Sequence, residues 1–289
     1  MLKLTDPEFI RKLEMLSLLT RKVLGGTLKA DRKTLKKGSG TTFADYTEYN
    51  FGDDYRSIDW NIYARLENLV IKLFELEEDL HIYLLVDFSR SMLSKTVFAK
   101  QLAAAIGYIA LNNLDRLTVY GLADHLQPII RPSHGRSRVM PMLRALESTE
   151  CFGEDTDFEQ CIKEFQSRGH RPGLCVVISD FFVHGEFEKA LDYLVWNRHD
   201  LFCLQVSSPQ DFKCELRGDI ELQCVETGES KRVTIGPAEA ARFAETVKEW
   251  NLKVQRSCER RGIGFSSASV TIPFELIIQN ILRHGGLVT

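Results

Sequence analysis

The stretch that decides the fold is HIYLLVDFSRSM, residues 81–92. Branched and aromatic apolar residues run up to Asp87, and hydroxyls follow that acid at alternate positions, Ser89 and Ser91. A short, continuous apolar run is typical of a strand buried on both faces of a parallel sheet. We therefore expect the acid and both hydroxyls on the loop at the carboxyl end of this strand, where open α/β sheets place their ligand sites.

The side chains of this loop favour one kind of ligand. Three oxygen-bearing groups, with no His or Cys among them, suit a hard cation such as Mg²⁺ or Ca²⁺. One acid and two hydroxyls neutralise the charge of such an ion only in part, so the ion could accept a further carboxylate from elsewhere. The competing interpretation is that Ser89 and Ser91 only cap the following helix, which is a common role of serine.

The chain after residue 80 alternates between apolar strands and helical patterns. We predict strands over 81–87, 117–122, 126–130, 174–180 and 201–206, and helices over 96–113, 137–148, 158–168 and 186–197. This alternation predicts an α/β fold with a doubly wound, mostly parallel sheet of the Rossmann type. The apolar strand 174–180 also ends in an acid, Asp180, which belongs at the same carboxyl edge as Asp87.

The regions on either side depart from this alternation. Residues 1–78 contain a predicted helix over 6–24, a basic segment from Lys29 to Gly40 that we interpret as a solvated loop, and a predicted strand over 69–77. Residues 211–289 contain a predicted β-hairpin over 219–235, a helix from Pro237 to about Arg261, a short strand and a closing helix. We expect three parts: an N-terminal extension over 1–78, the α/β domain over 79–210, and a C-terminal hairpin with helices over 211–289, packed on the main domain.

Composition and charge narrow the class of protein. The 289 residues are 44% hydrophobic and 27% charged, as in soluble globular proteins, and a net charge of −3 gives no reason to expect nucleic acid as a partner. The N-terminus is charged from Lys3, and the longest apolar helical stretch, 102–114, is too short for a membrane span. The seven cysteines form no C-x-x-C pair, which indicates a reducing compartment. We expect a cytoplasmic protein.

A segment rich in acids and aromatic residues precedes the main domain. Residues 52–60 read GDDYRSIDW, and Ala64-Arg65 follows shortly after. Two interpretations stay open: an internal network of ion pairs and ring contacts that docks the segment on the main domain, or a surface that binds a partner protein. The residues that could bind the partner are Asp53, Asp54, Arg56, Asp59, Trp60 and Arg65.

Five residues form one ordered pattern: Asp87, Ser89 and Ser91, then Thr156 in a Gly- and acid-rich loop, then Asp180. This set resembles the metal-ion-dependent adhesion site (MIDAS) of von Willebrand factor A domains. The resemblance implies that the three hydroxyls bind a divalent ion directly, Mg²⁺ or else Mn²⁺ or Ca²⁺. It also implies that both acids hold the ion mainly through water, and that an acidic side chain of a partner fills the sixth position.

A second resemblance covers most of residues 40–207. The segment GDDYRSIDW, together with KLFE at 72–75 and ISDF at 178–181, is similar to the bacterial family called domain of unknown function 58. The resemblance implies a von Willebrand factor A-like domain with added segments. It also implies a link to AAA+ ATPases of the MoxR type, which act as chaperones in the assembly or activation of other proteins.

The leading hypothesis is a non-enzymatic, metal-dependent adaptor that binds proteins beside a MoxR-type ATPase. No His or Cys falls in the metal loops to act as base or nucleophile, and we interpret the nearest candidate, His184, as a solvated histidine. The alternative is a Mg²⁺-dependent hydrolase or phosphotransferase with Asp87 as nucleophile. Such enzymes usually offer a second acid where this chain has Ser89, and a Lys later in the chain that neutralises the phosphate. A third interpretation is a scaffold whose metal site is vestigial.

Overall fold

The computed structural model describes residues 3–24, 33–37, 42–77, 80–153, 157–183, 187–212, 218–223 and 230–283. The chain forms two compact units. One consists of Met1–Thr20 together with Leu80–Thr289, and the other of Arg21–Asp79.

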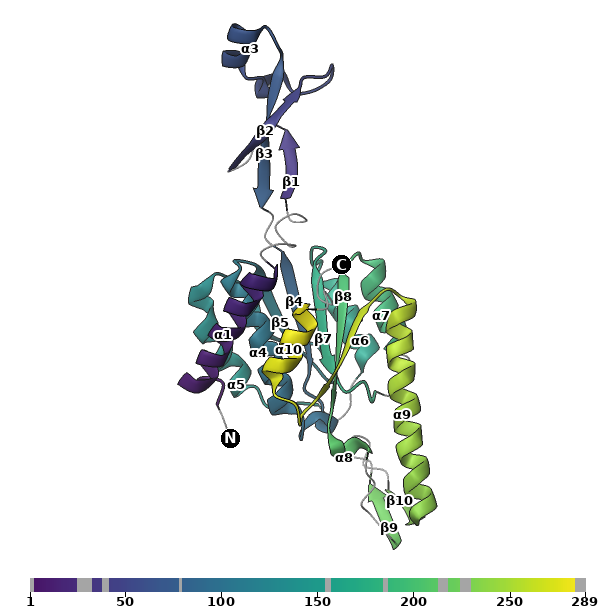
Figure 1. The fold of residues 1–289 in the computed structure, drawn as a ribbon. Coiled ribbons are helices and arrows are strands. Elements are labelled where there is room, and N and C mark those ends of the chain that lie inside the picture. Colours follow the sequence, from purple (N-terminus) through teal and green to yellow (C-terminus); the bar gives the residue numbers. More distant parts are fainter. Residues whose placement is uncertain are drawn as a thin grey trace. The chain divides into compact units, whose positions relative to one another are not determined.

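The larger unit is built on a six-stranded sheet with the order β11–β8–β7–β4–β5–β6 (Figure 1). Neighbouring strands pair in parallel except for β6, which pairs antiparallel with β5. The strands are β4 (His81–Asp87), β5 (Arg116–Leu122), β6 (Gln127–His134), β7 (Leu174–Ser179), β8 (Asp200–Ser207) and β11 (Gly264–Ser269). The predicted α/β fold with a mostly parallel central sheet is confirmed.

Helices cover both faces of this sheet (Figure 1). One face carries α4 (Thr96–Asn112), α5 (Val139–Ser148) and α10 (Phe274–Arg283), and α1 (Pro7–Leu24) joins them through a Phe9–Phe274 ring contact. The other face carries α6 (Phe158–Ser167), α7 (Phe187–Trp196) and α9 (Pro237–Arg260). These helices lie close to their predicted bounds.

The burial of the central strands explains their unbroken apolar sequences. All of β7 is buried, and β4 is buried from Ile82 onward. Leu85 packs with Phe165 and Leu191 on the α6 and α7 side. Its neighbour Leu84 is also fully buried and points to the opposite face, because side chains alternate along a strand. Burial of one leucine side chain contributes about 1.5–3 kcal/mol, so these strands fix the position of the loops that follow them.

The C-terminal region begins with the short helix α8 (Pro209–Phe212). The strands β9 (Gly218–Gln223) and β10 (Ser230–Ile235) then pair antiparallel, as the predicted hairpin requires. The short strand predicted near the C-terminus is β11, which extends the central sheet by pairing in parallel with β8. None of the described helices is both long and apolar enough to cross a membrane.

The smaller unit contains a three-stranded antiparallel sheet with the order β1–β3–β2. Its strands are β1 (Lys33–Lys37), β2 (Thr42–Glu48) and β3 (Val70–Glu77). The prediction of a solvated loop from Lys29 to Gly40 was therefore wrong over residues 33–37. The charged sequence of β1 has no strand pattern of its own, and its extended form depends on pairing with β3.

A short turn of helix, η1 (Tyr55–Ser57), and the helix α3 (Trp60–Leu66) stand between β2 and β3 in the sequence. The sequence of α3 is WNIYARL, whose first residues have modest helix propensity. Its start is fixed instead by Asp59, whose carboxylate accepts hydrogen bonds from the amides of Asn61 and Ile62.

Candidate functional site

The candidate site lies at the carboxyl edge of β4 and β7, the two central strands. β4 ends at Asp87, and Asp180 directly follows the last residue of β7, Ser179. Both acids are buried, with 1% of their surface exposed. The Ser179 hydroxyl donates a hydrogen bond of 2.6 Å to Asp87 Oδ2, which links the two strand ends.

Among the described residues, the donors to the Asp87 carboxylate are neutral. Its Oδ1 accepts the amide of Ser89 at 2.9 Å, and its Oδ2 accepts the Ser179 hydroxyl. Burial raises the pKa of Asp87 to about 6, and the nearby charge of Asp180 acts in the same direction. Two buried carboxylates this close repel one another, so a cation beside Asp87 would be stabilised.

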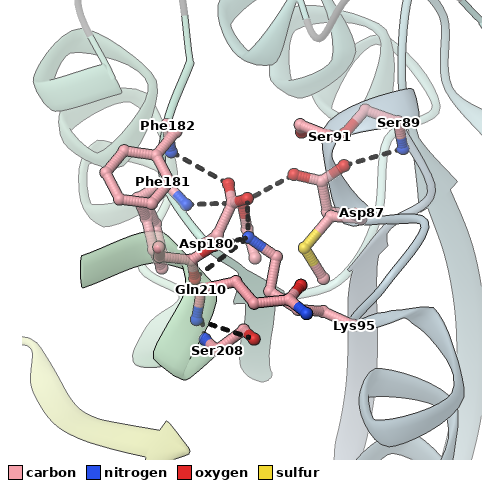
Figure 2. A network of polar contacts seen from close by, with 12 residues as sticks. Asp87, Ser89, Ser91, Lys95, Asp180, Phe181, Phe182, Ser208 and Gln210 are labelled. Carbon is pink, nitrogen blue, oxygen red and sulfur yellow. Dashed lines mark hydrogen bonds and ion pairs between the residues drawn. The ribbon is translucent and has the colours of Figure 1, made fainter. Parts of the chain in front are cut away.

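The two serine hydroxyls face each other above this acid. Ser89 Oγ and Ser91 Oγ are 2.9 Å apart, and Ser89 is completely buried (Figure 2). Although Ser89 precedes the turn η2 (Arg90–Met92), its side chain makes no capping hydrogen bond. The interpretation of Ser89 as a helix cap is therefore wrong.

The donor set fits a small, hard cation. Mg²⁺ takes octahedral oxygen ligands at about 2.0–2.1 Å, which places adjacent ligand atoms about 2.9 Å apart. The separation of the Ser89 and Ser91 hydroxyls, 2.9 Å, satisfies that geometry. Among the residues that the structure describes, no group of three or more His, Cys, Asp or Glu side chains could hold a metal. Hydroxyls would therefore have to supply part of the coordination.

The third hydroxyl of the pattern, Thr156, lies outside the described residues, as does His184. The described ends of the loop that contains Thr156 are bonded to the site edge. The amide of Phe152 donates to the Phe88 carbonyl at 3.0 Å, and the amide of Asp157 donates to the Ala123 carbonyl at 3.1 Å.

A buried lysine in the site was missed by the sequence analysis. Lys95 is the residue before α4, and its side chain is only 3% exposed. Its Nζ donates to Asp180 Oδ2 at 2.6 Å (Figure 2). It also lies 3.3 Å from both carboxylate oxygens of Asp211 on α8. Asp211 follows the buried strand β8, so the reasoning that found Asp87 and Asp180 could have found it as well.

The loop that carries Asp180 is held in an unusual conformation. Phe181 has a φ of 59°, in the left-handed region that costs most non-glycine residues about 1–2 kcal/mol. Two donors fix the loop: Trp250 Nε1 of α9 bonds the Phe181 carbonyl, and Gln205 Nε2 of β8 bonds the Asp180 carbonyl, both at 3.1 Å. These bonds position Asp180 against Lys95.

In the smaller unit, the three acids proposed for partner binding are used internally. Asp53 accepts the Asn50 amide at 3.0 Å, and Asp54 accepts the Arg56 amide at 3.0 Å. Asp59 caps α3 and pairs with Lys72 Nζ at 2.9 Å, and that hydrogen bond holds its pKa below the usual value. An internal network thus exists within this unit.

The remaining residues of that set are exposed. Trp60 has 57% of its surface exposed, and Arg56 and Arg65 are exposed as well. Further apolar side chains of the same unit are open to solvent: Phe51, Tyr55, Tyr63 and Leu66. Asp54 is exposed too, so among the acids of the set Asp59 is the buried one.

The fold and the site define an α/β protein that gathers two acids and two hydroxyls at the carboxyl edge of a mostly parallel sheet. Residues 45–251 match the family described as protein of unknown function DUF58, and the chain belongs to that family. The sequence resemblance to this family is therefore confirmed.

Similar proteins were found among both known sequences and solved structures. Uncharacterized protein Mb1516 of Mycobacterium bovis is 27% identical over 267 residues, which cover 90% of this chain and 83% of that protein. Among solved structures, conserved hypothetical protein BatB from Bacteroides thetaiotaomicron is similar with a TM-score of 0.41 and 15% identity. That similarity covers 70% of this chain and 97% of BatB.

Proposed function

We propose that this protein is a metal-dependent protein-interaction module, without enzymatic activity, that works in the cytoplasm with a MoxR-type AAA+ ATPase in the assembly or activation of other proteins. The observation that carries the metal-dependent part is the pair of facing serine hydroxyls above a buried acid. The ATPase partner and the von Willebrand factor A-like character follow from the resemblance described above.

The proposed ligands have distinct roles. Ser89 and Ser91 would bind Mg²⁺, or else Mn²⁺ or Ca²⁺, through their hydroxyls, and Thr156 would add a third. Asp87 and Asp180 would act mainly through bound water, since Mg²⁺ gives up its water reluctantly. The ion, when bound, supplies positive charge that attracts an acidic side chain of the partner.

The exposed side of the site suits such a partner. Ser91 is only partly buried, whereas Ser89 and Asp87 are buried, so access is from the side of η2. On that side Arg90 is exposed and Leu93 is 60% exposed. One basic and one apolar side chain beside the open hydroxyl favour a partner segment that combines an acid with an apolar residue.

The alternative function, a hydrolase or phosphotransferase with Asp87 as nucleophile, has less support. A nucleophilic carboxylate must be reachable by its substrate. Asp87 is 1% exposed and both of its oxygens accept hydrogen bonds. Turnover of a phosphoester that Asp87→Asn abolishes would favour this alternative.

The smaller unit offers a second surface for the same assembly. We assign Trp60, Arg56 and Arg65 to partner contact, whereas Asp53, Asp54 and Asp59 hold the fold of that surface. Aromatic and arginine side chains contribute most of the binding energy in many protein interfaces. Trp60→Ala should weaken capture of the partner and leave the melting temperature of the chain unchanged.

The test of the proposed function is binding of the purified chain to a purified MoxR-type ATPase from the same organism, in Mg²⁺ and in EDTA. Wild type should bind in Mg²⁺ only, and Ser91→Ala should bind weakly in both. Ser167→Ala, which removes an exposed hydroxyl at the end of α6, is the matched control and should behave as wild type. Equal binding by Ser91→Ala and wild type, or binding that EDTA does not change, would contradict the proposal.

A further inference from the structure

Lys95 and Asp211 form a charged pair that the proposed function does not use. The Lys95 ammonium lies 2.6 Å from Asp180 Oδ2 and 3.3 Å from each oxygen of Asp211. The two side chains are 3% and 16% exposed. An ammonium group this deeply buried needs ionic partners to offset its lost hydration, so both acids stabilise Lys95, and the Phe182 ring lies 5.6 Å from its Nζ.

The two acids of the proposed metal site are therefore not equivalent. Asp180 is bonded to a cation, and its other carboxylate oxygen, Oδ1, accepts the Phe182 amide at 2.9 Å. Within the described part of the chain, the donors to Asp87 are neutral: the Ser89 amide and the Ser179 hydroxyl. Lys95 thus neutralises one of the two carboxylates that a divalent ion would use.

We infer that Lys95 is a built-in competitor of the divalent ion for Asp180, and that it sets the affinity of the site for the ion. This inference rests on the proposed function. Two cations that draw on the same buried carboxylate repel one another strongly, because little water is present to screen them. Asp211 supplies a second acceptor for the ammonium. Lys95 therefore keeps an ionic partner when Asp180 binds the ion instead.

The sharpest test replaces the pair without changing the net charge. Lys95→Met/Asp211→Asn removes one positive and one negative charge, leaves Asp180 free of the ammonium, and avoids an unpaired buried Asp211. Calorimetric titration of the full chain with Mn²⁺ should give a dissociation constant on the order of tenfold lower than that of wild type. Lys12→Met/Glu275→Gln removes the half-buried α1–α10 ion pair and should bind Mn²⁺ as wild type does.

A second variant gives the opposite expectation. Asp211→Asn alone leaves the ammonium to Asp180, so Mn²⁺ should bind more weakly than to wild type. Melting in EDTA reports whether each variant is folded, independently of the ion.

The outcomes separate the two claims. If wild type binds Mn²⁺ and the charge-matched double variant binds it equally or more weakly, Lys95 is not a competitor and the inference is overturned, while the metal site stands. If neither wild type nor any variant binds Mn²⁺, the metal-dependent function fails and the inference fails with it.

Discussion

At the scale of single residues, the buried acid Asp87 shows a conflict between stability and binding. Its charge is buried beside Asp180, and its pKa is raised because that environment disfavours the ionised form. A residue that destabilises the folded chain and sits beside facing hydroxyls is typical of a binding site.

We therefore expect Asp87→Asn to have two effects at pH 7.5. The ion-free variant should be more stable than wild type by roughly 1–3 kcal/mol, because the buried charge is removed, the amide oxygen still accepts the Ser89 amide, and the amide nitrogen can donate to the Ser179 hydroxyl oxygen. Mn²⁺ binding should be lost. Urea unfolding in EDTA and calorimetry measure the two effects, and a less stable variant that still binds Mn²⁺ would contradict this account of Asp87.

Gly173 is required by a close backbone contact. A Cβ at this position, just before β7, would lie 2.2 Å from the carbonyl oxygen of His81. Because backbone atoms cannot move aside as a flexible side chain can, Gly173→Ala should destabilise the larger unit by about 1–3 kcal/mol. The measurement is the midpoint of urea unfolding. An unchanged midpoint would show that the backbone near His81 can shift to make room for the added Cβ.

The site residues differ in how far the sequence predicts them. Asp87, Ser89, Ser91 and Asp180 follow from two buried strands that end in acids, since topology alone brings strand ends to one edge. The role of Lys95 could not be predicted, because its side chain contacts an acid that is distant in the sequence. No local sequence pattern indicates such a contact.

At the scale of elements, a cluster of histidines and aromatic rings joins the strands to α6. His170 packs on Phe165, and its Nε2 shares a hydrogen bond of 3.0 Å with the Tyr120 hydroxyl. His199 packs on the rings of Tyr83 and Phe165. Burial lowers the pKa of His170 and of His199, and the charge of His199 further lowers that of His170.

This cluster predicts a loss of stability in acid. A histidine whose folded-state pKa lies below its unfolded value binds more protons when unfolded, so its contribution is lost as pH falls below about 6.5. His170→Gln should therefore lose less free energy of unfolding between pH 7 and pH 5 than wild type does. His125→Gln, at a largely exposed position, is the control. Identical pH dependence in wild type and His170→Gln would contradict the role of this cluster.

The helix α3 depends on one capping acid. Asp59→Ala removes both hydrogen bonds at the start of the helix and the ion pair with Lys72. The smaller unit should then unfold at a lower urea concentration, and the fluorescence of Trp60 in α3 offers a local probe. Asp124→Ala, an exposed acid of the larger unit, should leave that transition unchanged.

The elements themselves were predicted unevenly, for a physical reason. β4 and β7 are buried on both faces, so their composition alone identifies them. β1 and α3 were not predicted, because pairing with β3 forms the first and the Asp59 cap starts the second. Neither strand pairing nor a helix cap appears in the sequence as a periodic pattern of apolar residues.

At the scale of the whole molecule, the class of fold was predictable but the strand order was not. Strand–helix alternation indicates a parallel sheet, yet it does not reveal that the last strand, β11, lies next to β8. The sequence of β11, GFSSAS, is largely polar and only partly buried, so its place at the sheet edge depends on long-range packing of α9 and α10.

The proposed function depends on a divalent ion at the carboxyl edge of the sheet. Anomalous diffraction from crystals of the full chain grown with Mn²⁺ tests it most directly. We expect a single peak at this edge, about 2.1 Å from the hydroxyls of Ser89 and Ser91. A peak elsewhere, or no peak while the two hydroxyls remain bonded to each other, would contradict it.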